Sequence, residues 1–304
     1  MSHLFNGSQY QLLDLILSKG MVNVKRKVVS LALILSIVLM LVARLYIDNN
    51  VVQITENEIV SSEIPEAFEG YTILQISDLH NRSFGANNSQ LIRKIDKVGP
   101  DIIVITGDMV TGNDTDFTVF FELIENISDR YEIIFVPGNH EVALKNEDKE
   151  KFLDLFDEND VVFLDNENIE LSIDGETISL YGLWYEIPYY KRQDLTAEMI
   201  QERIGDVDSS KYTILLTHHP KYFELYEGWG ADLILTGHVH GGMVRLPMIG
   251  GIFSPDTFWF PQYSAGQYTI HDSTMIVSRG LGIGTRGFRL FNRPELVVIT
   301  LKTA

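Results

Sequence analysis

The chain of 304 residues contains no cysteine. It therefore has no disulfide framework, no catalytic thiol and no zinc site built on thiolates. Any metal that it binds must be held by His, Asp, Glu or Asn. With 45% hydrophobic and 11% aromatic residues, the composition is typical of a chain that folds around a substantial core, and it excludes disordered and collagen-like classes.

Basic residues are also scarce, with 24 Lys and Arg against 42 Asp and Glu and a formal net charge of −18. Nucleic acids are bound over a broad surface by basic faces that release counterions, so we expect no nucleic-acid surface here. The charge is unevenly spread. Residues 1–47 hold five basic residues and one acidic residue, net +4, which leaves −22 for residues 48–304.

Long apolar runs are limited to one, from Val28 to Ile47, whose only charged residue is Arg44. About 20 such residues span a bilayer as a helix, and an arginine near the end can extend to the interface. A buried core helix would show a polar stripe, which this run lacks. A cleaved signal peptide is disfavoured by the long leader and by the missing small-x-small cleavage site. We predict an uncleaved transmembrane anchor at residues 28–47 after an N-terminal arm, residues 1–27.

The charges that flank this segment predict its orientation. Lys25, Arg26 and Lys27 precede the segment, and acidic sequence begins at Asp48. Positive charge stays on the cytoplasmic side, so we expect a single-pass protein of the cell membrane with a cytoplasmic N-terminus and the rest outside the cytoplasm. We interpret residues 48–69, which are polar and contain five Glu, as a linker, and residues 70–304 as one folded domain.

Beyond residue 70, short β-branched runs alternate with helical patterns, as in strand-like Tyr71–Ser77, helix-like Ser89–Val98 and strand-like Asp101–Thr106. This alternation predicts βαβ units around a buried sheet. From Val161 to Trp184 the short strands and Asn, Asp and Gly turns are more typical of antiparallel pairing. We expect an α/β fold: a four-layer α/β/β/α sandwich of two mixed sheets, preceded by one transmembrane helix.

Potential metal ligands follow five of the predicted strands and include six of the eight histidines. The segments are Ser77-Asp78-Leu79-His80, Thr106-Gly107-Asp108, Pro137-Gly138-Asn139-His140-Glu141, Thr217-His218-His219-Pro220 and Thr236-Gly237-His238-Val239-His240-Gly241-Gly242. One Asp-x-His or Gly-Asp alone is more often a surface pair or a turn. Because ligands bind at the carboxyl edge of an open α/β sheet, five repetitions of the arrangement predict one site.

Nitrogen and oxygen ligands without sulfur suit Mn, Zn, Fe or similar ions. The ligands outnumber what one ion needs. Two ions about 3.5–4 Å apart that share a carboxylate activate water and clamp the oxygens of a displacement at phosphorus. We therefore expect two divalent metal ions as cofactors.

In order along the chain, the motifs Asp-x-His, Gly-Asp, Gly-Asn-His-Glu, His and Gly-His-x-His resemble the pattern of the calcineurin-like metallophosphoesterase superfamily over about residues 70–301. The stretches His240–Pro247, Ser278–Gly282 and Arg289–Glu295 resemble a membrane-tethered bacterial branch related to the phosphodiesterases YkuE and YaeI. The resemblance implies a metal-dependent phosphoric ester hydrolase that cleaves phosphodiester bonds with a hydroxide bridging the two metals.

The resemblance also implies roles by position. Asp78, His80 and His240 would hold one ion, Asn139, His218 and His238 the other, and Asp108 would bridge them. His140 resembles the histidine that stabilises or protonates the leaving oxygen, and neighbouring side chains on a turn point apart, which disfavours it as a further ligand.

Three residues beside these motifs have weaker assignments. Arg82 is a candidate for binding the substrate phosphate, although an ordinary surface arginine explains it as well. For His219 we favour a place behind a ligand or at the surface, and for Glu141 a structural role that orients a neighbouring loop.

The aromatic, proline-rich loop of residues 243–268, which includes Phe258, either lines a substrate cleft or meets the bilayer, or it covers the second sheet. If it meets apolar substrate, a lipid-linked phosphate ester is the expected class. The alternative enzyme is a pyrophosphatase acting on a lipid-linked or nucleotide-sugar pyrophosphate. A non-catalytic binding scaffold is disfavoured because all seven ligand positions are intact.

Overall fold

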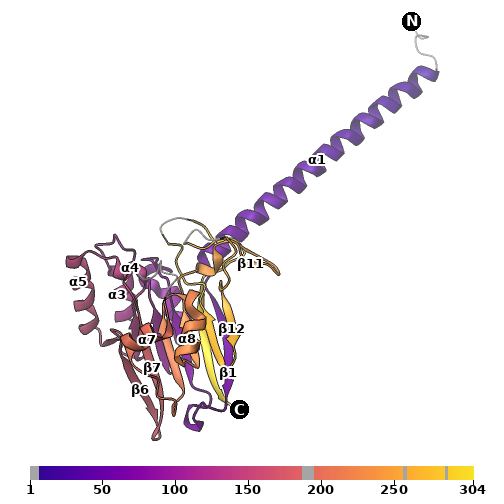
Figure 1. Cartoon of the computed structure of the whole chain (residues 1–304). Coiled ribbons are helices and arrows are strands. Elements are labelled where there is room, and N and C mark those ends of the chain that lie inside the picture. The colour runs from indigo at the N-terminus through magenta and orange to yellow at the C-terminus, as the bar shows by residue number, and fades with distance from the viewer. Residues whose placement is uncertain (1–6, 187–194, 256–258, 285–286) are drawn as a thin grey trace. The chain divides into compact units, whose positions relative to one another are not determined.

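The computed structural model describes residues 7–186, 195–255, 259–284 and 287–304, so Phe258 lies outside the described residues (Figure 1). The chain divides into two compact units, Met1–Tyr46 and Ile47–Ala304. Helix α1 (Gly7–Asn50) makes up the described part of the first unit as far as Tyr46, and its last turn, from Ile47, belongs to the second unit. Among the described residues, Val24–Asn50 is the one stretch long and apolar enough to cross a membrane, with a mean hydropathy of 2.7. It contains the predicted anchor.

The second unit is built on two six-stranded mixed sheets. In the first sheet β2 to β5 run parallel, and β14 is antiparallel to β2 and parallel to β1. Its order is β1 (Gln53–Ser61), β14 (Glu295–Thr303), β2 (Thr72–Ile76), β3 (Ile102–Thr106), β4 (Ile133–Val136) and β5 (Val161–Phe163).

In the second sheet β13, β9, β8 and β7 run parallel, and the two edge strands are antiparallel to their neighbours. Its order is β12 (Gly266–Ile270), β13 (Ser273–Val277), β9 (Leu233–Thr236), β8 (Thr213–Thr217), β7 (Glu176–Leu183) and β6 (Asn168–Ile173). The central strands are continuous apolar runs because both of their faces are covered.

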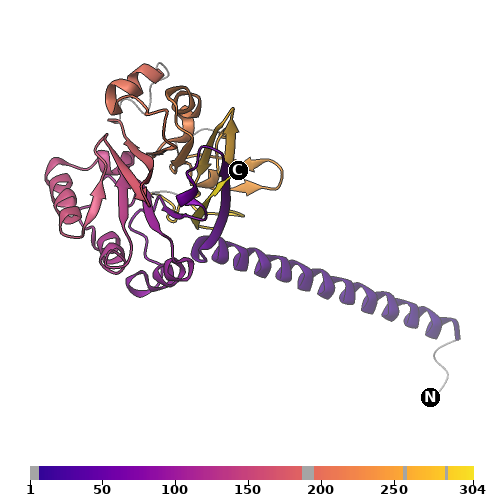
Figure 2. The same cartoon turned by 90° about the horizontal axis from the view of Figure 1, so that it is seen from below.

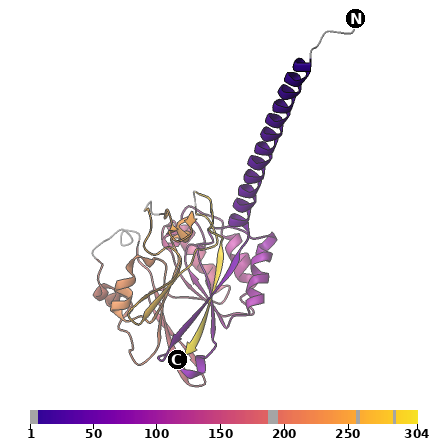
Figure 3. The same cartoon turned by 90° about the vertical axis from the view of Figure 1, so that its right-hand side faces the viewer.

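The sheets pack face to face, with helices on both outer sides. Between them lies an apolar cluster that joins Ile73 and Val104 of the first sheet to Ile214 and Leu235 of the second. Figure 3 shows magenta helices on one side of the sheets and orange helices on the other. The helices are α2 (Ser89–Val98), α3 (Thr118–Glu125) and α5 (Asn146–Asp157) on the first sheet, and α7 (Ala197–Ile204) and α8 (Phe223–Trp229) on the second.

This architecture confirms the expected two-sheet α/β fold with its N-terminal apolar helix. The stretch expected to be a linker, residues 48–69, differs from that expectation because it contains β1, which pairs with β14 over nine residues. The strand alternates exposed and half-buried side chains, so its composition resembles that of a solvated segment. Helix α5, which the sequence analysis did not predict, buries Phe152 and Phe156 against the first sheet.

Phenylalanine rings form the contact between α3, α5 and the first sheet. The ring of Phe120 on α3 lies 4.9–6.2 Å, between centroids, from four others, those of Phe121, Phe135, Phe152 and Phe156. Phe120 is fully buried. Because such rings combine a large buried area with favourable edge and tilted contacts, this cluster holds the outer helices on the edge where β3 and β4 end.

We predict that Phe120→Ala lowers the free energy of unfolding by about 3–5 kcal/mol, because the cavity left among rigid rings cannot collapse. The matched control is Phe288→Ala, whose side chain is 53% exposed and which should change stability by less than about 0.5 kcal/mol. Urea unfolding of the full chain in detergent, followed by circular dichroism, measures both. Equal effects of the two substitutions would contradict the assigned cluster.

Candidate metal centre

The carboxyl ends of β2, β3, β4, β8 and β9 meet at one edge of the domain. Cross-sheet hydrogen bonds join these ends, including Gln75 Nε2 to the Thr236 carbonyl at 2.9 Å. Every predicted ligand and His140 follows one of these strands, and their side chains come together in overlapping groups. The groups within 4.8 Å are Asp78 with His80 and His240, His80 with Asp108 and His140, and Asp108 with His218 and His238.

The first group faces Asp78. Nε2 of His80 lies 3.1 Å from Nε2 of His240, and the latter is 3.4 Å from Oδ1 of Asp78. Nδ1 of His240 is 3.3 Å from the carbonyl of Gly282, which accepts its proton, so Nε2 of His240 presents a lone pair to the centre. Two imidazole nitrogens and a carboxylate oxygen directed at one point form a cation site.

The second group faces Asp108. Nε2 of His218 lies 3.1 Å from Oδ2 of Asp108, while its Nδ1 donates to the Thr106 carbonyl at 2.7 Å. Nδ1 of His238 is 2.9 Å from Oδ1 of Asn139, the first residue of the short helix α4 (Asn139–Val142). Because Asp108 also lies 3.9 Å from His80 Nε2, it is the carboxylate shared by both groups.

Deep burial makes the centre strongly polarised. Burial opposes protonation of His218, but the charges of Asp108 and Asp78 outweigh it and raise the pKa of His218 to about 10. Burial lowers the pKa of His80 to about 3 and holds the pKa of His240 well below its usual value. Burial also raises the pKa of Asp78. Burial would raise the pKa of Asp108 as well, but the histidines around Asp108 outweigh burial and hold its pKa low.

Two buried ring nitrogens test whether these residues fit metal ions. Nε2 of His218 and Nδ1 of His80 have no hydrogen-bond partner among the described residues. A buried nitrogen without a partner is costly, and Nε2 of His218 faces two carboxylates, at 3.1 Å from Oδ2 of Asp108 and 4.0 Å from Oδ1 of Asp78. A divalent cation between these groups would satisfy all of them, so the donor set fits the implied metals.

The ligand loops have unusual backbone conformations. Five of the seven predicted ligands have positive φ angles, between 48° and 70°, and these are Asp78, His80, Asp108, His238 and His240. Non-glycine residues rarely adopt this region, and its cost is usually carried at functional sites. The conformation turns each side chain back over the end of its own strand.

Two glycines allow the loops to approach closely. A Cβ at Gly237 would overlap Ser77 and Asp78, and one at Gly138 would overlap Asp108. Glycine is therefore required at both positions because the backbone passes directly against ligand carboxylates.

Glu141 holds two of these loops together. Its carboxylate is buried and accepts the backbone N–H groups of Asp108, Met109, Val110 and Gly138 at 2.7–3.2 Å. Burial raises its pKa, and these N–H donors oppose that shift. Glu141 thus orients the Asp108 loop, the structural role that the sequence favoured, although the sequence did not reveal its four donors.

The loop after β13 supports the first group from behind. The fully buried guanidinium of Arg289 donates to the carbonyls of Arg279, Gly280 and Gly282. Asn292 donates from Nδ2 to the His240 carbonyl at 2.7 Å. Sequence reasoning placed both residues in a family-like stretch and assigned no role to either.

His140 projects from α4 toward Asp108, with Nε2 3.9 Å from Oδ2. Its Nδ1 accepts the backbone N–H of Gly112 at 2.9 Å, which places the ring proton on Nε2 in the neutral form. The side chain is partly exposed, unlike those of the buried ligands. His140 therefore presents an N–H group to the open side of the centre.

The remaining predicted residues lie at the margin. Arg82 donates to the carbonyl of Asn49 and its guanidinium lies over the ring of Phe84, so its role in substrate binding stays a prediction. His219 is buried behind the second group, with its ring centroid 4.1 Å from that of His238, and its Nδ1 accepts the N–H of Lys221.

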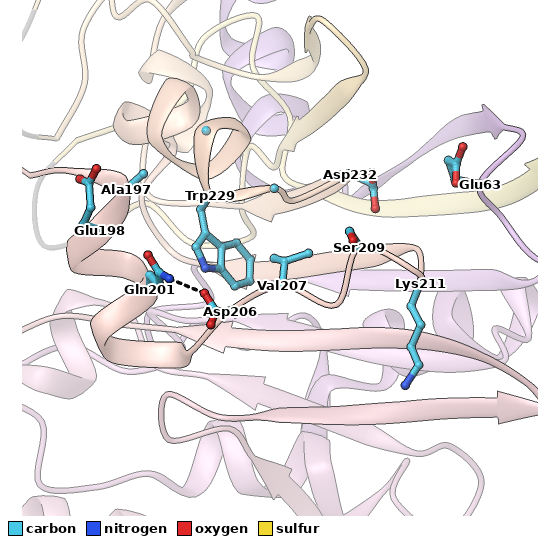
Figure 4. A pocket seen from close by; sticks show the side chains of 12 residues that line it. Glu63, Ala197, Glu198, Gln201, Asp206, Val207, Ser209, Lys211, Trp229 and Asp232 are labelled. Carbon is cyan, nitrogen blue, oxygen red and sulfur yellow. Dashed lines mark hydrogen bonds between the residues drawn. The ribbon is translucent and has the colours of Figure 1, made fainter.

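A cavity of about 750 Å³ lies elsewhere and contains none of the predicted ligands. Lys211 and Asp232 line it just before β8 and β9 begin, so it opens at the opposite edge of the second sheet from the ligands (Figure 4). Its Glu63, Glu198 and Asp206 outnumber the single lysine. We therefore place the functional site at the histidine cluster, where the unsatisfied nitrogens are.

Comparison with known proteins gives one family. The sequence model of the calcineurin-like phosphoesterase family matches residues 71–242. The metallophosphoesterase YkuE of Bacillus subtilis (strain 168) is 29% identical over 266 residues, which cover 85% of this chain and 88% of YkuE. The metallophosphoesterase Cj0846 of Campylobacter jejuni is 28% identical over 272 residues, covering 88% of this chain and 69% of Cj0846.

Among solved structures, phosphopantetheinyl hydrolase (PptH) from Mycobacterium tuberculosis aligns with a TM-score of 0.41 and 14% identity, covering 71% of this chain and 90% of that chain.

We predict that metal binding is proton-linked. Without an ion, His218 keeps a proton up to a pKa of about 10, so binding near neutral pH must release it. Acid therefore weakens binding, and the apparent affinity rises about tenfold per pH unit for each proton released. Titration calorimetry in two buffers of different ionisation enthalpy should show about one proton released per chain.

The matched variants are Asp108→Asn and Asp272→Asn. The first removes the charge that raises the pKa of His218, so it should reduce both proton release and metal affinity, the latter by more than tenfold. Asp272 is exposed, and its variant should bind like the original chain. Proton release that is unaffected by Asp108→Asn would contradict the proposed coupling.

Proposed function

We propose that this chain, which belongs to the calcineurin-like phosphoesterase family, hydrolyses phosphodiester bonds at a centre that holds two divalent metal ions. Membership makes it a metal-dependent phosphoesterase, and the diester preference and the number of ions are our proposals. The observation that supports them is that six of the predicted ligands fall into overlapping groups within 4.8 Å, of which Asp108 belongs to two, and that Oδ1 of Asn139 lies 2.9 Å from Nδ1 of His238.

Each residue has a defined task in this proposal. Asp78, His80 and His240 would hold one ion, Asn139, His218 and His238 the other, and Asp108 both. Two divalent ions, when bound, would polarise the phosphoryl oxygens and acidify the attacking water. The protein fixes the positions of the ligands through Glu141 and Asn292, so no reorganisation is needed when the substrate arrives.

His140 is the proton donor in this proposal. Its Nδ1 is occupied by the N–H of Gly112, so only Nε2 is available, and Nε2 points toward the shared carboxylate. From there its N–H can donate a hydrogen bond to a phosphoryl oxygen. To pass this proton to the departing alkoxide, the ring first takes up a proton on Nδ1 and releases the N–H of Gly112. The backbone of Gly112 thus sets the tautomer of the proton donor.

The charge around the centre favours a diester. A monoester brings two negative charges, which enzymes usually neutralise with arginines, whereas a diester brings one. Two arginines already donate to backbone carbonyls, Arg289 to three and Arg82 to that of Asn49, although Nη1 of each has no hydrogen-bond partner among the described residues. Metal charge then has to balance most of the charge of the substrate, which suits a monoanion.

We predict that His140→Ala lowers kcat about 10²–10⁴-fold for diesters with alkyl leaving groups and much less for bis-p-nitrophenyl phosphate, because p-nitrophenolate departs without a proton. Metal content should stay unchanged. His271→Ala, at an exposed histidine, is the matched control. A loss of equal size for all leaving groups would remove the proton-donor role, and metal-loaded protein that cleaves no diester would refute the proposed function.

We further propose that α1 anchors the protein in the cell membrane with residues 48–304 outside the cytoplasm. The apolar segment is uncharged for 16 residues before Arg44, and the net +4 of residues 1–47 contrasts with −22 beyond them. Basic residues remain on the cytoplasmic side during insertion.

Tags at the two termini test this orientation. Protease added to intact cells should remove a C-terminal tag and leave an N-terminal tag protected until lysis. Protection of the C-terminal tag in intact cells would place the domain inside and contradict the proposal. A cytosolic protein with a protease-resistant fold is the control for cell integrity.

A further inference from the structure

Large apolar side chains are exposed in one region of the second unit. Among the described residues of this unit, the exposed large apolar side chains lie at the end of α1 or in the loops between residues 246 and 291, with the single exception of Val60. At the end of α1 these are Ile47 and Val51. In the loops they form what we call the apolar patch: Leu246, Met248, Ile249, Trp259, Phe260, Phe288 and Phe291.

Backbone contacts bring the segments of the apolar patch side by side. The hairpin of β10 (Arg245–Leu246) and β11 (Gly250–Gly251) carries Met248 at its turn. Val244, just before the hairpin, bridges to Leu290, and Phe253, just after it, bridges to Trp259. Figures 1 and 2 show this hairpin projecting from the edge of the domain. Tyr263 and Tyr268 of the same loop pack on the second sheet, which is one of the roles predicted from the sequence.

A groove of about 570 Å³ lies between the hairpin and Phe291, with Arg245 and Arg279 in its lining. Nη1 of Arg245 donates to the Gly241 carbonyl at 2.8 Å and to Oγ of Ser264 at 3.2 Å. Nε of Arg279 is buried without a hydrogen bond and lies 3.5 Å from Glu295. Burial and the charge of Arg279 lower the pKa of Arg245. Two adjacent guanidinium groups in an acidic domain attract an anion.

Hydrogen bonds connect this region to the end of the apolar helix. The backbone N–H of Phe291 donates to Oδ2 of Asp48 at 2.6 Å. Asn49 and Arg289 exchange two hydrogen bonds, at 2.9 and 3.0 Å. Asp48 directly follows the predicted anchor. If the anchor crosses the bilayer, Asp48 and the Phe291 backbone that is bonded to it lie close to the lipid surface.

We propose that this groove binds the phosphate headgroup of an anionic membrane lipid. Arg245 and Arg279 contact the phosphate, and the apolar patch inserts among the upper acyl carbons. Proteins that bind an anionic lipid surface typically contact the lipid phosphates with basic side chains and insert neighbouring aromatic and aliphatic side chains among the acyl chains. The inference rests on the membrane attachment of the proposed function and is independent of its catalysis.

Tryptophan fluorescence offers a direct readout. The chain has three tryptophans, at positions 184, 229 and 259, and therefore none within α1. Trp259 is 68% exposed in the apolar patch, and Trp229 is buried. Full chain in nanodiscs whose acyl chains carry bromine should show quenching that rises with the fraction of phosphatidylglycerol and disappears in Trp259→Phe.

The arginines are tested by substitution. Each cation near an anionic surface strengthens binding about fivefold, so Arg245→Gln and Arg279→Gln should each raise the half-saturating phosphatidylglycerol fraction by about that factor. Lys211→Gln, beside the distant cavity, is the matched control and should change nothing. Because Arg245 also holds a loop, Met248→Ser with Ile249→Ser is a second test and should lower quenching without changing charge.

The outcomes separate the possible sources of the anion. Quenching that is equal in zwitterionic nanodiscs, or that survives loss of both arginines, would overturn the headgroup site. Displacement by inorganic phosphate at millimolar concentration would identify a soluble phosphate instead and would also overturn it. Hydrolysis of bis-p-nitrophenyl phosphate, measured on the same samples, tests the proposed function separately. Hydrolysis without quenching overturns the lipid site alone, and quenching without hydrolysis overturns the catalytic proposal alone.

Discussion

The burial of two carboxylates at one edge of the sheets is the constraint on which the rest of the structure depends. Asp78 and Asp108 are almost fully removed from water, and removing a carboxylate from water costs several kcal/mol unless opposite charge is close. In the protein alone, His218 supplies part of that charge by keeping a proton. Burial lowers the pKa of His80 and of His240, so these two rings do not supply the rest. The domain is therefore arranged around positive charge that it does not itself contain.

Keeping these groups in place requires support that reaches far from the ligands. Positive φ angles at five ligands would relax if the loops were free to move. Glu141 ties the Asp108 loop to α4, and Asn292 ties the His240 loop to the segment that leads into β14. Arg289 closes the loop after β13 by binding three carbonyls. The backbone N–H of the same arginine donates to Oδ1 of Asn49, so the loop after β13 is also tied to the first residues of the second unit.

Sequence reasoning identified the ligands because of a geometric rule: parallel strands end at a common edge, so Asp78 and His218 could be brought together without knowledge of the loops between them. It could not find the supports. The four donors to Glu141 belong to backbone positions that become neighbours only after folding, and the tautomer of His140 depends on one N–H at Gly112. Strand β1 was not predicted for a similar reason, because its partner strand lies about 240 residues away in the sequence and its own composition is that of a solvated segment.

The position of β14 has a consequence for how the domain is made. This last strand lies between β1 and β2, which are among the first parts of the domain to leave the ribosome. Until residues 295–303 have been synthesised, β1 has no partner and one edge of β2 stays open, so the first sheet cannot be completed during translation. An apolar N-terminal helix would by then already be available to the membrane-insertion machinery. Completion of the sheet therefore waits for β14, and exposed strand edges must be protected from aggregation until then.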